Sequence, residues 1–282
     1  MRYGSTASTI STSFTGASAI KSKRVVFDDG AETTVERWGS RGPVVLAVHG
    51  MTSSRRSWER LAAHLEGRYR VVAYDQRGHG DSANVAGPMA LPRGVRDVEQ
   101  IVAALGEPID VLIGHSWGGA IAIEAGLRIP VWRVAAIDPM IRQADDSWYC
   151  EFLDELRDQF AAQGAARDAR IREEYAQWAP VDVEAKVHAV RAMTISPIEA
   201  LMLENPPELW DLREQIAHYD KPLFLAMAAR GEGINDAATL DALERNHAST
   251  VEIATFPGAG HNLHRTAFEA FAEALDAWLA RT

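Results

Sequence analysis

The sequence predicts an α/β fold: a mostly parallel, eight-stranded sheet flanked by helices, with an inserted all-helical cap. Short apolar runs alternate with helical periods along the chain, which is typical of a parallel sheet covered by helices. Several runs contain Val, Ile, Leu and Ala without polar alternation, as expected for strands buried on both faces. This alternation stops for about 70 residues late in the chain, which predicts the helical insertion.

Length and composition limit the class of protein. The chain has 282 residues, of which 47% are hydrophobic, enough for a sizeable core. Its formal charge is −10 and no basic stripe is present, so we expect a small-molecule substrate and no nucleic-acid partner. No apolar stretch approaches the length of a membrane span, and Cys150 is the single cysteine. We therefore expect a cytoplasmic protein that associates with no membrane and has no disulfide. The composition does not predict its oligomeric state.

The elements follow in order along the chain. Residues 1–22 are rich in Ser, Thr, Ala and Gly without the apolar run of a secretory signal, so we expect a flexible tail. Eight strands are predicted, at 24–27, 33–38, 44–48, 70–74, 110–113, 131–137, 222–228 and 250–255.

Apolar residues at helical spacing predict two core-facing helices. One helix lies between the fourth and fifth strands, and the other ends the chain. Their core-facing residues are Val95, Val98, Ile101, Val102 and Leu105 in the first, and Phe268, Phe271, Leu275, Trp278 and Leu279 in the second.

The insertion defines the predicted domains. We expect a core of residues 23–139 and 212–282, and a helical cap of residues 140–211. Most aromatic residues of the cap are expected to pack against the core. Together with Trp117, two of them, Trp148 and Trp178, are candidates for contact with a substrate.

The segment Gly-His-Ser-Trp-Gly-Gly at 114–119 follows an apolar strand and precedes a helical run. A serine at a sharp strand-to-helix turn has a strained backbone, and neighbouring side chains would collide there. Gly114 and Gly118 lack those side chains. The pattern therefore predicts Ser116 as a nucleophile at such a turn.

With this motif in place, the chain resembles the α/β-hydrolase superfamily over most of residues 24–282. Segment 48–51 resembles the family's oxyanion loop, segment 74–82 the loop after the fourth strand, and segment 258–264 the loop of the catalytic histidine. The resemblance implies that the amides of Met51 and Trp117 form an oxyanion hole. It implies His261 as the general base, while His49, His79 and His115 would brace loops and His264 would belong to the start of a helix.

The acid that orients His261 is left open by the sequence. The usual aspartate of the family falls on Gly233, so the chain departs from the pattern there. Asp236 and Glu232 lie in the same loop, and either would serve if that loop were shifted. Asp138, at the predicted end of the sixth strand, occupies the other position known in the family.

A serine nucleophile forms an acyl-enzyme, whereas related enzymes with aspartate in its place form an alkyl-enzyme ester. We therefore expect hydrolysis of a carboxylic ester, thioester or lactone, without a cofactor or a metal. Hydrolysis of a carbon–carbon bond in dienoate substrates remains an enzymatic alternative. A ligand-binding receptor on the same fold is the alternative from another class.

Overall fold

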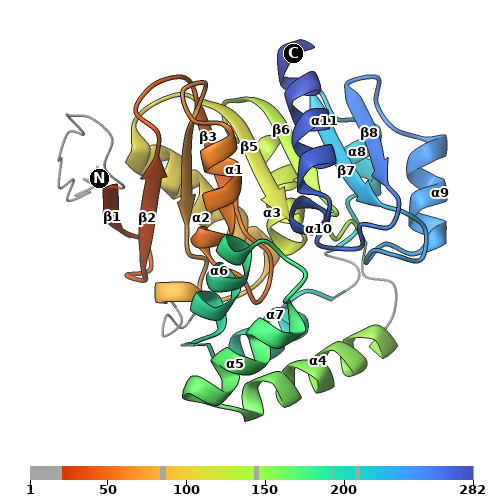
Figure 1. The fold of residues 1–282 in the computed structure, drawn as a ribbon. Coiled ribbons are helices and arrows are strands. Elements are labelled where there is room, and N and C mark those ends of the chain that lie inside the picture. The colour runs from red at the N-terminus through yellow and green to blue at the C-terminus, as the bar shows by residue number, and fades with distance from the viewer. Residues whose placement is uncertain (1–20, 83–86, 143–145, 192, 207–209, 282) are drawn as a thin grey trace, which may run out of the picture.

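The computed structural model describes residues 21–82, 87–142, 146–191, 193–206 and 210–281, and these form one eight-stranded sheet (Figure 1). The strands follow the order β1-β2-β4-β3-β5-β6-β7-β8 across the sheet. β1 and β2 pair antiparallel at one edge, and the other six run parallel. The predicted mostly parallel sheet is confirmed. Its strands are β1 (Lys21–Val26), β2 (Glu32–Trp38), β3 (Val44–Val48), β4 (Arg70–Tyr74), β5 (Ile109–His115), β6 (Val131–Ile137), β7 (Leu223–Ala228) and β8 (Val251–Phe256).

The N-terminal boundary needs one correction. Residues 21 and 22, which were expected in the tail, belong to β1 and pair with Arg37 and Glu36. Their backbone groups extend the hydrogen-bonded ladder with β2. The polar side chains of this segment give no sign of this pairing in the sequence. The rest of the expected tail, residues 1–20, lies outside the described residues.

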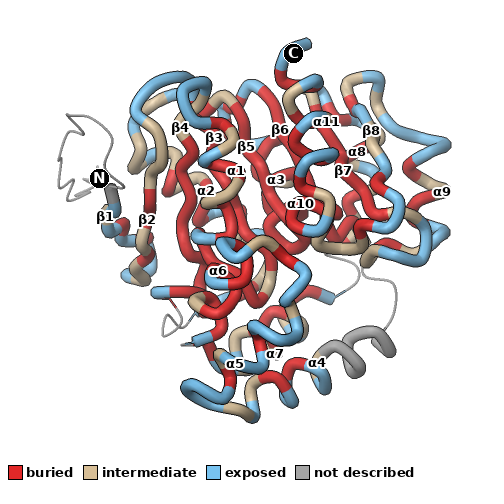
Figure 2. Tube along the Cα trace, viewed as in Figure 1, coloured by how far each residue is buried: buried red, intermediate tan, exposed pale blue. Residues whose placement is uncertain are grey.

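The central strands are buried on both faces, as Figure 2 shows along their length. Successive side chains of a strand point to opposite faces, so each strand contributes to two hydrophobic clusters. In β3, Val44, Leu46 and Val48 join one cluster, while Val45 and Ala47 join the other. This explains why the strands are apolar without alternation.

Helices cover both faces of the sheet. On the first face, buried residues come from α2 (Leu91–Leu105), α3 (Trp117–Gly126), α8 (Arg213–Ala217) and α9 (Ala237–Arg245). On the second face, they come from α1 (Glu59–His64), α10 (Leu263–Thr266) and α11 (Phe268–Arg281). The two stripes predicted from the sequence lie in α2 and α11, and both face these clusters.

Four helices of the described residues lie between β6 and β7: α4 (Asp146–Ala161), α5 (Gly164–Glu174), α6 (Pro180–Arg191) and α7 (Ser196–Glu204). Figure 1 shows them together beyond one end of the strands, where α6 also contacts α1. Two small apolar clusters, one around Leu156 and Ile198 and one around Ile171 and Val187, hold this layer together. The predicted helical insertion is therefore present.

Within the described residues, no helix has the length and apolar character to cross a bilayer.

Candidate active site

Ser116 lies at the turn between β5 and α3. Its backbone angles, φ 56° and ψ −121°, fall in a region that L-residues rarely adopt. A Cβ atom at Gly114 would overlap the carbonyl oxygen of Gly118, and one at Gly118 would overlap the carbonyl oxygen of His49. Only glycine fits at these two positions, so the strained turn at Ser116 depends on both.

His261 lies in the loop between β8 and α10, where its ring contacts a buried carboxylate. The Nδ1 atom of His261 is 2.7 Å from Oδ2 of Asp138. Asp138 follows the last residue of β6 and is 1% exposed. Its carboxylate also accepts hydrogen bonds from the amides of Ala228 at 3.2 Å and Ile234 at 3.3 Å. Three donors therefore hold the carboxylate in one orientation.

The other two acid candidates lie elsewhere. Asp236 caps α9, where its Oδ1 atom accepts a hydrogen bond from the amide of Thr239 at 2.6 Å. Glu232 accepts one from the amide of Gly258 at 2.7 Å, which ties its loop to the loop of His261. Neither carboxylate reaches the ring of His261 among the described hydrogen bonds. Asp236 is thus corrected from a candidate acid to a helix cap, because its loop begins α9 rather than turning toward the histidine.

Gly233 leaves room for the carboxylate of Asp138. A Cβ atom at this position would lie 2.6 Å from Oδ2 of Asp138 and 2.7 Å from Cβ of Ala228. The carboxylate of Asp138 therefore occupies the space that a side chain at position 233 would need. A glycine at position 233, in place of the family's aspartate, is therefore what makes room for the carboxylate of Asp138.

The loop after β3 lies against the serine turn. A Cβ atom at Gly50 would lie 3.0 Å from Cβ of Ser116, so the glycine permits this close approach. His49 is buried; its Nε2 accepts a hydrogen bond from the amide of Gln76 at 3.0 Å, which leaves Nδ1 to donate to the carbonyl of Gly50 at 2.8 Å. Burial lowers the pKa of His49 to about 4, so the ring is neutral at pH 7. His49 thus braces the loop.

Two backbone amides near Ser116 are available for a ligand. The N–H groups of Met51 and Trp117 donate no hydrogen bond to a protein group within the described residues. Met51 also lines the cavity above Ser116. Free N–H groups on both sides of a nucleophile are the arrangement that stabilises a developing oxyanion.

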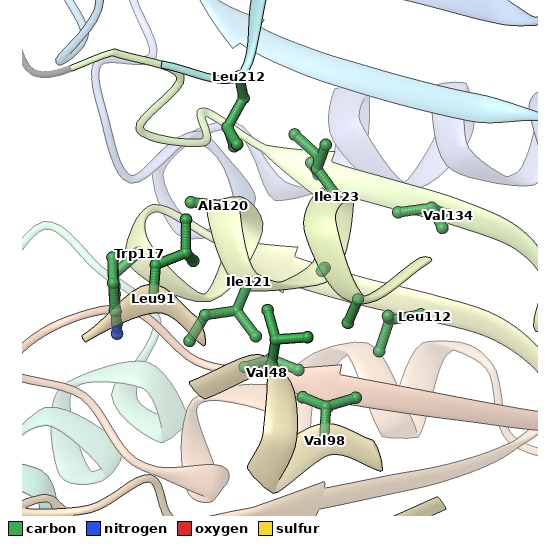
Figure 3. Close-up of a cluster of buried hydrophobic side chains, with 14 of the residues drawn as sticks. Val48, Leu91, Val98, Leu112, Trp117, Ala120, Ile121, Ile123, Val134 and Leu212 are labelled. Atoms are coloured by element: carbon green, nitrogen blue, oxygen red, sulfur yellow. The ribbon is translucent and has the colours of Figure 1, made fainter. Parts of the chain in front are cut away.

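The indole ring of Trp117 does not contact that cavity. It is 2% exposed and packs against Trp210, with ring centroids 4.7 Å apart. Figure 3 shows Trp117 beside Leu91 in the hydrophobic cluster that α2 and α3 share. The expectation that its side chain contacts a substrate is therefore wrong, because the first turn of α3 directs the ring into the core.

Ser116 and His261 line the same cavity, whose volume is about 430 Å³. Leu156 of α4, Tyr175 after α5 and Trp178 contribute walls from the insertion, and contact of Trp178 with a substrate stays a prediction. Trp148 lies in α4, and its side chain is outside the described residues. No hydrogen bond joins the Ser116 hydroxyl to the His261 ring in the described residues, and such bonds commonly tighten only when substrate is bound.

Neighbouring histidines support the loop of His261. Nε2 of His115 lies 3.1 Å from the carbonyl oxygen of His261, and the two rings are 4.7 Å apart. The ring of His264 packs against His115 with centroids 4.3 Å apart. Burial is the main cause that lowers the pKa of both His115 and His264 well below the usual value. Both rings are therefore neutral supports, as expected for His115.

The characteristic segment after β4 is a structural network. The carboxylate of Asp75 is fully buried and accepts hydrogen bonds from the Arg55 amide at 2.8 Å, the Arg55 guanidinium and the Asp81 amide at 2.9 Å. Arg55 is also paired with Glu36 at 2.8 Å. His79, in the same segment, has its Nδ1 atom 2.6 Å from the carbonyl oxygen of Arg77. These contacts hold the loop beside the site without entering the cavity.

Two buried cations are among the cavity residues that the sequence did not indicate as candidates. Lys186 of α6 and Arg265 of α10 both line the cavity and are buried. Lys186 interrupts an apolar stripe formed by Val183, Val187 and Val190, and a lysine within such a stripe is the one sequence signal that indicates it. Among the described residues, no group of three or more His, Cys, Asp or Glu side chains could hold a metal ion.

Comparisons with known proteins identify the family. Residues 44–274 match the family model described as the alpha/beta hydrolase family. The chain is 34% identical to lipase LipV of Mycobacterium tuberculosis over 153 residues, 52% of this chain and 56% of that protein. It is 32% identical to the bifunctional esterase/perhydrolase DCH of Acinetobacter calcoaceticus over 146 residues, 48% of this chain and 53% of that protein. The chain thus spans about half the length of these two curated relatives.

Among solved structures, the chain is similar to that of E-2-(acetamidomethylene)succinate hydrolase. The TM-score is 0.76 with 23% sequence identity, over 93% of this chain and 100% of the other. At that identity the likeness concerns the fold.

Proposed function

Because the chain belongs to the alpha/beta hydrolase family, we propose that it hydrolyses a carboxylic ester, or a related thioester or lactone, through an acyl-enzyme on Ser116. His261 is the general base and Asp138 is the acid that orients it. One observation carries the proposal: His261 contacts the buried carboxylate of Asp138 at 2.7 Å and shares a cavity with the strained Ser116. The names of the relatives, a lipase and an esterase/perhydrolase, support the same class of substrate.

The first half-reaction forms the acyl-enzyme. The Ser116 hydroxyl attacks the carbonyl carbon while its proton passes to Nε2 of His261. Nδ1–H of His261 donates to Asp138, which keeps Nε2 free to accept that proton and stabilises the imidazolium that forms. The bond from the carbonyl carbon to the leaving oxygen then breaks, and His261 returns the proton to the departing alcohol.

Water completes the cycle by the same route. It attacks the acyl carbon while His261 takes one of its protons, and the ester bond to Ser116 then breaks to release the acid as His261 returns the proton to Oγ of Ser116. In both half-reactions, negative charge develops on the former carbonyl oxygen. The unpaired amides of Met51 and Trp117 would bind this oxygen, and one such donor contributes about a hundredfold or more to the rate.

The proposal is tested by active-site labelling and ester turnover. We expect a fluorophosphonate probe to label the wild-type protein and not Ser116→Ala, and 4-nitrophenyl esters of short acids to be hydrolysed only by the wild type. Loss of both signals in a folded Ser116→Ala protein supports the acyl-enzyme. A wild-type protein that neither reacts with the probe nor hydrolyses any ester of the series would contradict the proposal and favour a receptor on the same fold.

The assignment of the acid has its own prediction. Asp138→Asn keeps the shape of the side chain and removes its charge, so we expect kcat to fall by about 10⁴-fold, since the histidine loses its oriented tautomer. Asp236→Asn is the matched control, because asparagine also caps a helix and Asp236 lies outside the cavity. Equal losses in the two variants, measured as kcat on one ester, would remove Asp138 from the role.

A further inference from the structure

Two buried cations line the cavity that holds Ser116 and His261. Lys186 comes from α6 and Arg265 from α10, and each is 6% exposed. They thus approach the cavity from the insertion and from the core. A charged side chain is rarely this buried without a carboxylate partner.

The partners of these cations are neutral. Nζ of Lys186 donates to the carbonyl oxygen and hydroxyl of Thr52, at 3.1 and 2.8 Å. Arg265 donates to the hydroxyl of Ser53 at 3.2 Å and to the side-chain oxygen of Asn262 at 3.3 Å. Lys186 also lies 5.4 Å from the ring centroid of Tyr175. Neither cation forms an ion pair within the described residues.

No carboxylate near the cavity forms an ion pair with either cation among the described residues, although the charge of Asp182 raises the pKa of Arg265. Asp182 is buried, and its carboxylate pairs with Arg60 at 3.2 Å. Three other acidic side chains line the cavity and are exposed: Glu155, Asp158 and Glu174. Arg55 and Arg77, in contrast, are equally buried and each contacts a buried carboxylate. The protein pairs these arginines and leaves the cations of the cavity without a counter-ion in contact.

We propose that the cavity binds an acyl group that carries a free carboxylate, which Lys186 and Arg265 hold while the ester carbonyl meets Ser116. The inference rests on the proposed function and names its substrate class. Thr52 and Ser53, the residues that the cations contact, directly follow Met51, whose amide would bind the carbonyl oxygen. A short acyl chain therefore extends from that oxygen toward both cations, and a cavity of about 430 Å³ suits a small dicarboxylic half-ester.

The electrostatics of the site favour an anion. Burial, followed by repulsion from Arg265, lowers the pKa of Lys186 to about 7, while the charge of Glu174 acts in the opposite direction. Burial lowers the pKa of Arg265 to about 10, and Asp182 partly offsets this. Two like charges in a low-dielectric cavity repel each other, and a bound carboxylate would relieve that repulsion and accept hydrogen bonds from both.

The test compares two esters that differ in charge. 4-Nitrophenyl hydrogen glutarate carries a carboxylate, and 4-nitrophenyl hexanoate is the neutral comparison. The rate with Ser116→Ala gives the spontaneous reaction of each ester. We expect the wild type to prefer the anionic ester by about tenfold or more in kcat/KM, and Lys186→Met or Arg265→Gln to lower this ratio by about tenfold.

Matched variants distinguish binding of the substrate carboxylate from a purely structural role of the two cations. Lys186→Arg keeps the charge and should keep most of the ratio. Arg172→Gln removes a cation of the same insertion that is exposed and paired with Glu184, so its ratio should equal that of the wild type. If Lys186→Met and Arg265→Gln lower both esters equally, the two cations only hold the loop of Thr52 and Ser53, and the inference is overturned. A wild-type ratio near one overturns it as well.

A binding measurement distinguishes this inference from the proposed function. Glutarate is titrated by calorimetry into Ser116→Ala and into Ser116→Ala with Lys186→Met. Binding to the first protein that weakens at least tenfold in the second supports the anion site even if no ester is hydrolysed. Ser116-dependent hydrolysis of the neutral ester without glutarate binding would leave the proposed function standing and refute the anion site.

Discussion

At Gly233 the backbone passes so close to Asp138 that a single added carbon atom would touch the carboxylate. The backbone angle φ of Gly233 is not positive, so the position excludes a side chain for reasons of space alone. The contact between His261 and Asp138 therefore depends on a residue that carries no functional group.

This close approach predicts the behaviour of Gly233→Ala. Because the new methyl group would lie 2.6 Å from Oδ2 of Asp138, the carboxylate must shift away from His261. We expect kcat/KM on an ester to fall by about tenfold or more, with a loss of stability of about 1–3 kcal/mol from overpacking. The measurements are ester kinetics and urea unfolding.

A double variant provides the control. In an Asp138→Asn background, whose acid is already lost, Gly233→Ala should lower the rate little further, since both changes act on one contact. Fully additive losses would mean that Gly233 acts on the rate by another route.

Single residues were predictable where a motif constrains the backbone. Gly114, Ser116 and Gly118 sit in a turn that allows few residue types. The partner of His261 could not be chosen from the sequence, because it depends on which of two loops faces the ring in space. The side chain of Trp117 was misplaced for a related reason: its amide direction follows from the turn, whereas its ring direction follows from the packing of α3.

At the scale of elements, the loop between β4 and the 3-10 helix η2 (Gly80–Ser82) is organised by one carboxylate. Asp75 binds the amide and guanidinium of Arg55 at one end and the amide of Asp81 at the other. All three donors lose their partner if this carboxylate is removed. The loop is thus held by a buried charge rather than by apolar packing.

Asp75→Ala is accordingly expected to destabilise the protein by about 3–5 kcal/mol, because it leaves the buried charge of Arg55 partly unpaired. Asp81→Ala removes an ion pair of the same Arg55 whose carboxylate is 47% exposed, so its cost should stay below about 1 kcal/mol. Urea unfolding of both variants measures the difference. Similar losses of unfolding free energy in the two variants would show that the Asp75 carboxylate stabilises the protein no more than the exposed Asp81 does.

Elements were predictable where hydrophobic residues repeat over a long stretch. All eight strands and the helices α2 and α11 follow from such repeats. Strand ends were displaced by up to three residues, as at β1, because backbone pairing continues into polar segments. The short helix α9 was not predicted, since it buries only Thr239, Leu240 and Leu243, whereas His264 lies in the first turn of α10, at the start of a helix as expected.

At the scale of the whole molecule, four histidines are buried without charge: His49, His79, His115 and His264. Burial is the first cause of the lowered pKa in each, and it brings His49 to about 4 and His79 to about 3. In an unfolded chain these rings titrate near a pKa of about 6.5. Below that pH the unfolded chain binds protons that the folded protein does not, so acid favours unfolding.

We therefore expect the free energy of unfolding to fall as the pH decreases from about 6.5 to about 4, by up to about 1.4 kcal/mol per pH unit for each histidine. Thermal unfolding at several pH values gives the trend, and calorimetry in buffers of different ionisation enthalpy counts the protons taken up. His218→Gln, at an exposed position, should not change the slope. A stability that is constant between pH 7 and pH 5 would contradict the expectation.

The insertion begins after β6, and this position affects how the sequence of the protein can diverge. Asp138 is the residue directly after β6, and Ser116 and His261 also follow strands, so α4–α7 carry none of the three. Under the proposed function, mutation or recombination within these four helices would change the walls of the cavity, Lys186 included, and replace none of the three residues. Part of the proposed selectivity can therefore diversify apart from the residues that cleave the bond, while Arg265, in α10 of the core, stays next to them in the sequence.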